Sequence, residues 1–389
     1  MGKPKLYIEV NGNKFVYVPG DFVAGNLIIE SNDSMDFKKI EVKFKGQAYV
    51  HWSESHGSGD NRRTEHYSAR ETYFKLGVVL MDSSRSPKIA AGRNVYPFQF
   101  QLPNNLPSSF EVSGGYVRYM IKGKIDRSGI FSDIKTMVLF TVLDCIDLNQ
   151  NPQSLMPSSG CDSKQLCCWC CASGPIEGKV NTDRIGYVPG EFININASIE
   201  NNSSTTLEGS SYDLVQMVTQ HSTRKSRSFP VTLVSGRGPG CGSHTSAHLS
   251  NQRLQIPALP PSPLRFCNII DIRYFVQLCV ETPTCHINLR VPAPIEIGTI
   301  PLRSTMGNMA TPPEVAETSF QPVPTAPIPN TTEYAPQPQP TNFQAPPPSY
   351  SAATAVNIET KATYEGTATT FAPQYNYYDW SQSAFTYNK

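Results

Sequence analysis

The chain has 389 residues, a net charge of +1 and 33 prolines, and 39% of its residues are hydrophobic. This length accommodates about two domains with an extension, and the nearly neutral charge argues against a general nucleic-acid binder, which would carry a strongly basic face. No run of about 18 apolar residues occurs, so no membrane-spanning helix is expected. Residues 1–7 contain no apolar signal core, and we therefore expect a cytoplasmic chain whose cysteines are mainly reduced thiols.

A hexapeptide occurs twice in the chain. Tyr17-Val18-Pro19-Gly20-Asp21-Phe22 returns 170 residues later as 187–192, with Glu in place of Asp. Pro-Gly is typical of turns, because proline presets φ and glycine accepts a positive φ. Each copy is followed by an alternating apolar run and an Asn/Ser-rich loop. The two copies predict one β-structured unit that is used twice.

The first half of the chain is predicted to form strands almost throughout. Residues 40–50 and 116–125 alternate between apolar and polar side chains, which is typical of a strand with one buried face. The polar segment 51–66 is predicted to be a loop between strands. Further strands are expected at 72–80, 95–102 and 134–143.

Changes in composition divide the chain into domains. We predict a first domain over 5–147, a linker rich in Asn, Gln, Pro and Ser over 148–165, and a second domain over 166–302. No 3.6-residue periodicity is sustained, so the fold class is all-β, with two tandem β-sandwiches. Residues 303–389 are rich in proline and poor in aliphatic side chains, and we expect a disordered tail. Strands of the second domain are expected at 192–199, 211–220, 229–235, 268–280 and 285–291.

The tail contains a P-P-x-Y motif within Pro346-Pro347-Pro348-Ser349-Tyr350. Consecutive prolines preform a polyproline II helix that docks on the aromatic groove of a WW domain, while the tyrosine fills a neighbouring pocket. Pro347, Pro348 and Tyr350 are therefore the candidate WW-binding residues, and a solvated spacer is the alternative. A second copy is not clear, because residues 372–375, Ala-Pro-Gln-Tyr, lack the first proline.

A second short motif is P-T-A-P at Pro324-Thr325-Ala326-Pro327. This pattern is read by the ESCRT machinery, which sorts ubiquitinated cargo. In a stretch so rich in proline, a chance match within a spacer is the favoured interpretation.

Cysteines cluster at 167–171, the sequence Cys-Cys-Trp-Cys-Cys. A C-x2-C pair can be drawn, but no second knuckle of a zinc site is evident, so small buried strand residues are favoured over a metal site and S-acylation stays open. Strand alternation would place Cys167, Trp169 and Cys171 on one face. No H-E-x-x-H, G-x-S-x-G or P-loop pattern occurs, and we expect neither an enzyme nor a bound metal or cofactor.

Taken together, these features resemble the α-arrestins, or arrestin domain-containing proteins, over residues 5–302. Each motif is weak alone, but their order along the chain is specific. The motifs that carry the resemblance are Tyr17–Phe22, Leu106–Glu111 followed by Gly115–Tyr119, Leu166–Cys171 followed by Gly174–Ile176, Gly186–Glu191 and Ile297–Leu302.

The resemblance implies two tandem arrestin-like, immunoglobulin-like sandwiches and an adaptor function. Such an adaptor links membrane receptors or transporters to WW-domain HECT-type ubiquitin ligases, through Pro347, Pro348 and Tyr350, and promotes cargo ubiquitination, endocytosis and endosomal sorting. It implies recruitment from the cytoplasm to the plasma membrane and endosomes through partners only. The alternative is a retromer-like trafficking scaffold that acts without a ligase. The sequence leaves open the cargo, the oligomeric state and any regulation through the tail.

Overall fold

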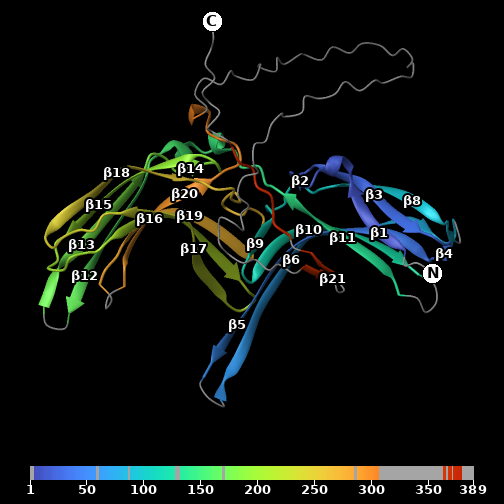
Figure 1. Ribbon diagram of the computed structural model, residues 1–389, viewed down its shortest axis with the longest axis horizontal. Helices are drawn as coiled ribbons and strands as arrows, with labels where there is room; N and C mark the ends of the chain where they lie inside the picture. The colour runs from blue at the N-terminus through green and yellow to red at the C-terminus, as the bar shows by residue number, and fades with distance from the viewer. Residues whose placement is uncertain are drawn as a thin grey trace, which may run out of the picture.

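The molecule consists of two β-sandwiches that lie side by side, with the N-terminal sandwich on the right of Figure 1. The computed structural model describes residues 4–57, 61–85, 88–127, 132–168, 171–283, 287–305, 362–364, 367–369 and 371–378, with the backbone alone at 167–168, 171–173, 362–364 and 367–369. Within these ranges the regular elements are strands and short 3-10 helices. The prediction of an all-β chain with two tandem sandwiches is confirmed.

The N-terminal sandwich packs a three-stranded sheet on a six-stranded one. The smaller sheet has the order β1 (Lys5–Val10), β3 (Phe22–Ser31) and β8 (Gly92–Gln101). The larger has the order β2 (Val16–Tyr17), β11 (Ile134–Val142), β10 (Gly115–Asp126), β5 (Lys39–His56) and β6 (Arg63–Asp82), and β9 (Phe110–Val112) pairs with β10. A small ladder joins β4 (Met35–Asp36) to β7 (Lys88–Ile89), and η1 spans Asn11–Asn13.

The C-terminal sandwich repeats this architecture. One sheet has the order β12 (Ser158–Cys168), β13 (Cys171–Thr182), β15 (Phe192–Asn201) and β18 (Thr245–Gln255). The other has the order β14 (Gly186–Tyr187), β20 (Leu289–Ile297), β19 (Ile270–Val280), β16 (Ser210–His221) and β17 (Ser226–Gly238). The remaining elements are η3 (Leu148–Gln150), η4 (Pro152–Leu155), η5 (Arg303–Thr305), and the hairpin of β21 (Ala362–Tyr364) and β22 (Thr367–Thr369).

The repeated hexapeptide begins the matching sheet in each sandwich. β2 and β14 are both two-residue strands that end at the tyrosine of the motif, and each pairs in parallel with the last strand of its domain, β11 or β20. The order of the remaining strands in the two larger sheets is also the same. One β-structured unit is therefore used twice, as the repeat predicts.

In the first copy the turn is closed by an acid and a cation. The backbone N–H of Val18 donates to Oδ2 of Asp21 at 3.2 Å, and Lys14 Nζ lies 2.8 Å from the same oxygen. Lys14 also lies over the ring of Tyr17, 4.9 Å from its centre. Gly20 has φ of 89°, which only glycine adopts without strain.

The second copy repeats each of these contacts with different residues. The N–H of Val188 donates to Glu191 Oε2 at 2.9 Å, and Arg184 Nη2 lies 3.0 Å from Oε1 of the same carboxylate. The guanidinium of Arg184 lies 4.5 Å from the ring centre of Tyr187, and Gly190 has φ of 97°. Asp and Glu are thus interchangeable at this position because each satisfies the same turn N–H.

Each sandwich also has a buried tyrosine whose hydroxyl ties the sheet to a preceding loop. Tyr119 donates to the carbonyl of Pro107 at 2.6 Å, and Tyr274 donates to that of Pro260 at 2.9 Å. The alternation predicted for 116–125 holds, since the inward side chains are fully buried. These inward side chains are Val117, Tyr119, Ile121 and Ile125.

We expect Tyr119→Phe to lower the free energy of unfolding by about 1–2 kcal/mol, because a buried carbonyl loses its donor. Tyr49→Phe is the matched control: Tyr49 is partly exposed on the outer face of the same sheet, and we expect almost no change. Urea denaturation of both variants measures the difference. Equal effects from the two substitutions would contradict this role of the hydroxyl.

The segment 51–66 is not simply a loop, and that prediction is wrong. β5 continues to His56 and β6 begins at Arg63, with His56 paired to Arg63. The two strands form a ribbon that extends past the sandwich (Figure 1), so most of their outer ends have no core to face. Hydrophobic alternation is therefore absent although the backbone is fully paired.

Two further predictions fail between the domains. β12 begins at Ser158, inside the segment 148–165 predicted as a linker. The sequence does not reveal this strand, because its side chains are mostly polar and show no apolar alternation. The cysteine cluster is not one continuous strand, because β12 ends at Cys168 and pairs antiparallel with β13, with Cys168 opposite Cys171. The predicted face of Cys167, Trp169 and Cys171 lies outside the described side chains. Within the C-terminal sandwich, β18 is a strand that the sequence does not predict, since its residues are mostly polar.

Candidate functional site

The motifs singled out in the tail lie outside the described residues. This applies to the P-P-x-Y residues Pro347, Pro348 and Tyr350 and to the P-T-A-P match at 324–327. The described regions that could form a functional site are the junction between the two sandwiches and a groove at the edge of the N-terminal one.

An ion pair lies at the centre of the junction. Arg265 donates from Nε and Nη2 to the two carboxylate oxygens of Asp144, at 2.6 and 2.7 Å, and from Nη2 to the carbonyl of Cys145 at 2.9 Å. The Asp144 side chain is 7% exposed and that of Arg265 is 44% exposed. The hydrogen bond to Asp144, followed by their electrostatic attraction, raises the pKa of Arg265 against the opposing effect of burial.

Hydrogen bonds join residues 146–149, where the N-terminal domain ends and the linker begins, to residues 299–301, which follow β20. The N–H of Ile146 donates to Thr299 Oγ1 at 2.7 Å, and Asp147 forms a parallel bridge with Ile300. Asn149 Nδ2 donates to the carbonyl of Pro301 at 2.9 Å. The chain between the domains is therefore held in one geometry.

The β5–β6 ribbon reaches the C-terminal sandwich and contacts β17 and the turn before it. Lys225 Nζ lies 2.5 Å from Glu54, and the guanidinium of Arg227 lies 4.8 Å from the ring centre of Trp52. Arg227 also donates to the carbonyl of Ser113 at 3.2 Å. The polar ribbon and these cations thus fix how the two domains meet.

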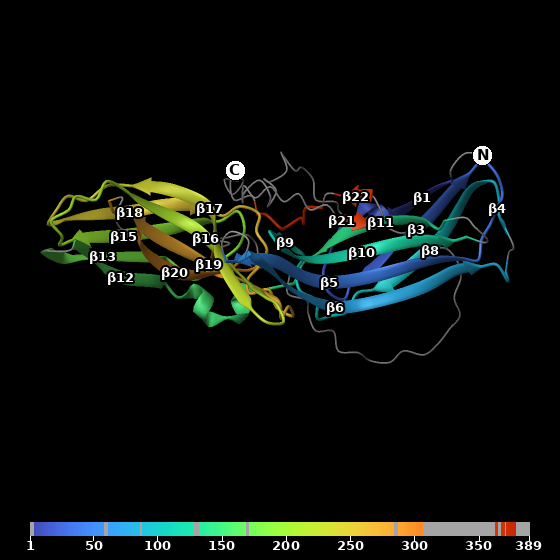
Figure 2. The same ribbon diagram turned by 90° about the horizontal axis from the view of Figure 1, so that it is seen from below.

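Residues 371–378 also lie at this junction and depart from the expectation of a disordered tail. Tyr375 is 8% exposed and belongs to the hydrophobic core, and Tyr378 packs against the cluster of Leu148, Val188 and Leu302. Both views show this C-terminal segment, red in the colour scale, between the two sandwiches (Figures 1 and 2). The signal in the sequence is alternation: positions 371, 373, 375 and 377 carry Phe, Pro, Tyr and Tyr.

A cavity of about 430 Å³ lies beside this segment. Residues of the first repeated turn, residues 143–145 after β11 and residues 299–300 after β20 line it together with Asn376 and Tyr378. Its walls thus come from both sandwiches and from the tail.

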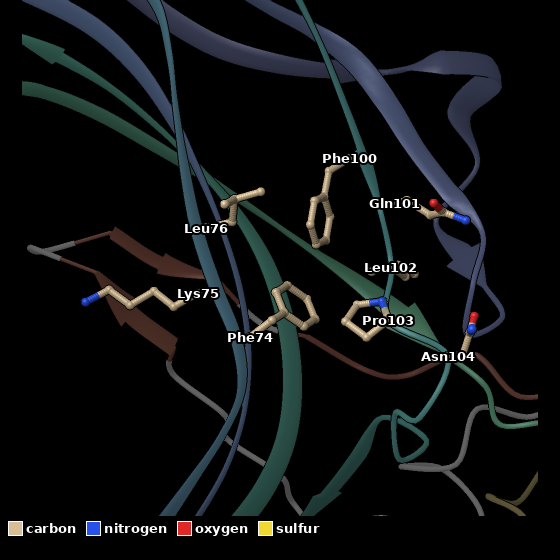
Figure 3. A pocket seen from close by; sticks show the side chains of 8 residues that line it. All are labelled: Phe74, Lys75, Leu76, Phe100, Gln101, Leu102, Pro103 and Asn104. Carbon is tan, nitrogen blue, oxygen red and sulfur yellow. The ribbon is translucent and has the colours of Figure 1, made fainter.

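A separate groove of about 490 Å³ lies between β6 and β8, the edge strands of the two N-terminal sheets. In Figure 3 the rings of Phe74 and Phe100 face the hollow, 5.2 Å apart, and Lys75 points away from it. Leu76, at the same edge, is 45% exposed. Among the described residues that line the groove, Lys75 is the titratable one.

The described residues contain no group of three or more His, Cys, Asp or Glu side chains that could hold a metal ion. Cysteines 145, 161, 241, 267 and 279 are free thiols. No helix in the described part of the chain is long and apolar enough to cross a membrane.

Comparison with known proteins matches both sandwiches to one family. The model described as "Arrestin (or S-antigen), N-terminal domain" matches residues 6–149, and that of the C-terminal domain matches 172–302. Arrestin domain-containing protein 17 of Caenorhabditis elegans is 32% identical over 325 residues, which cover 78% of this chain and 72% of the relative. The chain belongs to the α-arrestin family.

Other members of the family are similar over a comparable length. Arrestin domain-containing protein 1 of Mus musculus is 28% identical over 306 residues, 78% of this chain and 67% of the relative. Arrestin domain-containing protein 4 of Mus musculus is 28% identical over 297 residues, 74% of this chain and 70% of the relative. Proteins of the arrestin family are in general scaffolds rather than enzymes, and this α-arrestin is an arrestin-fold trafficking adaptor.

Proposed function

We propose that this α-arrestin links membrane receptors or transporters to WW-domain HECT-type ubiquitin ligases and so promotes cargo ubiquitination, endocytosis and endosomal sorting. The observation that carries the proposal is the intact P-P-x-Y motif, Pro347 to Tyr350, in a chain of this family. The protein acts in the cytoplasm and is recruited to the plasma membrane and endosomes through its partners.

The two parts of the chain have different tasks in this proposal. Pro347 and Pro348 dock as a polyproline II turn on the aromatic groove of the WW domain, and Tyr350 fills the adjacent pocket. Cargo is bound by the arrestin module, whose domains are held together by the Asp144–Arg265 pair and by the β5–β6 ribbon. Such a module presents a fixed surface to cargo while the motif holds the ligase.

The experiment is a titration of full-length protein into isolated WW domains of a HECT-type ligase. Tyr350→Ala should weaken binding by about thirtyfold or more, because a buried tyrosine anchor contributes at least about 2 kcal/mol. Tyr334→Ala is the matched control, since Tyr334 lies in the same tail but is not preceded by two prolines. We expect its affinity to equal that of the wild type.

Cargo ubiquitination in cells provides the second measurement. It should fall with Tyr350→Ala and remain with Tyr334→Ala. If ubiquitination is unchanged by Tyr350→Ala, the ligase link is wrong and the retromer-like scaffold becomes the better account. The P-T-A-P match at 324–327 stays a separate hypothesis of ESCRT binding, with a chance match in a spacer as the favoured interpretation, and comparing the binding of wild type and Pro324→Ala to the ESCRT machinery tests it.

A further inference from the structure

The side chains of residues 371–378 alternate between the protein and the solvent. Pro373 and Tyr375 are buried and Tyr377 is partly buried, whereas Gln374 and Asn376 are exposed. An extended backbone produces this period of two, and no helix or partner strand is needed for it. One face of the segment is therefore shaped to the surface beneath it.

On the N-terminal sandwich, Tyr375 and Gln374 of the segment donate hydrogen bonds. The hydroxyl of Tyr375 donates to the carbonyl of Ser109 at 3.0 Å, in a buried site. The backbone N–H of Gln374 donates to Thr141 Oγ1 at 3.1 Å. A buried tyrosine with its hydroxyl satisfied is typical of an anchor in peptide recognition, because it contributes apolar area and a hydrogen bond.

On the C-terminal sandwich the segment contacts the second repeated turn. The N–H of Tyr378 donates to the carbonyl of Pro189 at 3.1 Å, and its hydroxyl donates to the carbonyl of Thr299 at 2.6 Å. Gln255 Nε2 donates to the hydroxyl of Tyr377 at 2.9 Å. The same eight residues thus bond to both domains.

The two copies of the turn act as an internal comparison. A Cβ on Gly190 would overlap the backbone carbonyl of Tyr378, whereas a Cβ on Gly20 would meet only the side-chain oxygen of Asn104, at 2.8 Å. Val188 is fully buried, in a cluster that includes Tyr378, while the equivalent Val18 is 45% exposed. The second turn is therefore fitted to a peptide backbone and the first turn is not.

We propose that the junction between the two sandwiches is a binding site for an extended, tyrosine-rich peptide, and that residues 371–378 of the same chain are its resident ligand. The site recognises neutral side chains: Tyr375 enters the core, Tyr378 covers the second turn, and no charged group of the segment takes part. Tyr375 is also the tyrosine of the incomplete motif at 372–375, so a WW domain has no access to it while the segment is docked.

Docking has a geometric consequence for the ligase motif, and this consequence rests on the proposed function. Tyr350 lies 45 residues after Thr305 and 21 residues before Phe371. A fully extended chain spans about 3.4 Å per residue, so the motif could reach about 150 Å from Thr305 alone but only about 70 Å from Phe371. The docked segment therefore keeps a bound ligase near the arrestin module.

Hydrogen–deuterium exchange on the full-length protein tests the site directly. The amides of Gln374 and Tyr378 should be protected in the wild type, and protection of 371–378 should be lost in Gly190→Ala. Gly20→Ala is the matched control, because it imposes the same backbone strain at a glycine whose Cβ would meet Asn104 and not the segment, and 371–378 should remain protected there. Exchange of the wild-type segment at the rate of a free peptide would overturn the proposal.

A second experiment tests the same site with an added peptide. A labelled peptide with the sequence of 371–378 should bind saturably to full-length protein carrying Tyr375→Ala and Tyr378→Ala, whose site is intact but whose own ligand is weakened. Adding Gly190→Ala to that protein should abolish binding. Equal binding with and without Gly190→Ala would contradict the assigned site.

The mass in solution decides whether the ligand comes from the same chain. Light scattering should give a monomer under conditions in which 371–378 is protected. Protection only in a dimer would mean that the segment comes from a second copy, and the assignment within one chain would be wrong. The affinity for WW domains does not enter these measurements, so failure of the site and failure of the ligase proposal are distinguishable.

Discussion

Arg118→Leu is expected to lower the free energy of unfolding by about 3–5 kcal/mol at pH 8, because the buried carboxyl of Glu111 loses both hydrogen bonds from Arg118 and its cation. Arg118 lies 2.5 and 2.8 Å from the two oxygens of Glu111, and both side chains are less than 10% exposed. Arg118 also lies over the ring of Tyr116, 4.1 Å from its centre. The pair lies on β9 and β10, near the junction of the two domains.

The destabilisation should depend on pH in a specific direction. Loss of hydration on burial raises the pKa of Glu111 to about 7, and Arg118 lowers it only in part. The folded state therefore holds this proton more tightly than the unfolded chain, and stability falls as pH rises from about 4.5 to about 7. Without Arg118 the pKa rises further, so the variant continues to lose stability above pH 7.

Chemical denaturation at pH 5 and pH 8 measures this difference. The gap between Arg118→Leu and the wild type should widen by up to about 1.4 kcal/mol from pH 5, where Glu111 is protonated in both, to pH 8, because only the single pH unit above the wild-type pKa of about 7 separates the two titrations. The rest of the loss comes from the two hydrogen bonds that Arg118 donates and should be present at both pH values. The double variant Glu111→Leu with Arg118→Leu is the control, since removal of both charges should recover much of the loss. A gap of the same size at both pH values would show that Glu111 is not the source of the effect.

At the domain junction, Arg265→Ala should have a larger effect than substitution of its partner. Asp144 is almost completely buried, so loss of Arg265 leaves an unpaired carboxylate and costs about 2–4 kcal/mol. Arg265 is 44% exposed, and after Asp144→Ala it can turn to water, at a cost of about 1 kcal/mol. The order of the two effects follows from which partner solvent can reach.

Small-angle scattering combined with denaturation can separate opening of the junction from unfolding of a domain. We expect Arg265→Ala to increase the radius of gyration, because hydration of Asp144 requires the domains to separate. Asp144→Asn is the matched control, as its amide oxygen still accepts a hydrogen bond from Arg265, and it should keep the compact form. If both variants stay as compact as the wild type, the ion pair does not hold the domains together.

The amino-acid sequence by itself predicted the features that depend on local pattern. Alternation over 40–50 and 116–125 identified strands that proved to be the centre of the N-terminal sheet, because a buried face requires apolar residues at every second position. The repeated turn identified the internal duplication, because Pro-Gly with a following acid fixes a local backbone geometry. The P-P-x-Y motif is also local, and it carries the proposed function.

Only the tertiary structure decided how distant segments meet. The outer ends of β5 and β6 are paired although their side chains are polar, and backbone pairing leaves no mark on the sequence when neither face is buried. Asp144 and Arg265 are 121 residues apart, so their pairing could not be read from spacing. The docking of 371–378 depends on local alternation in the segment and on the arrangement of the two domains. Its binding surface exists only once the two sandwiches have been brought together.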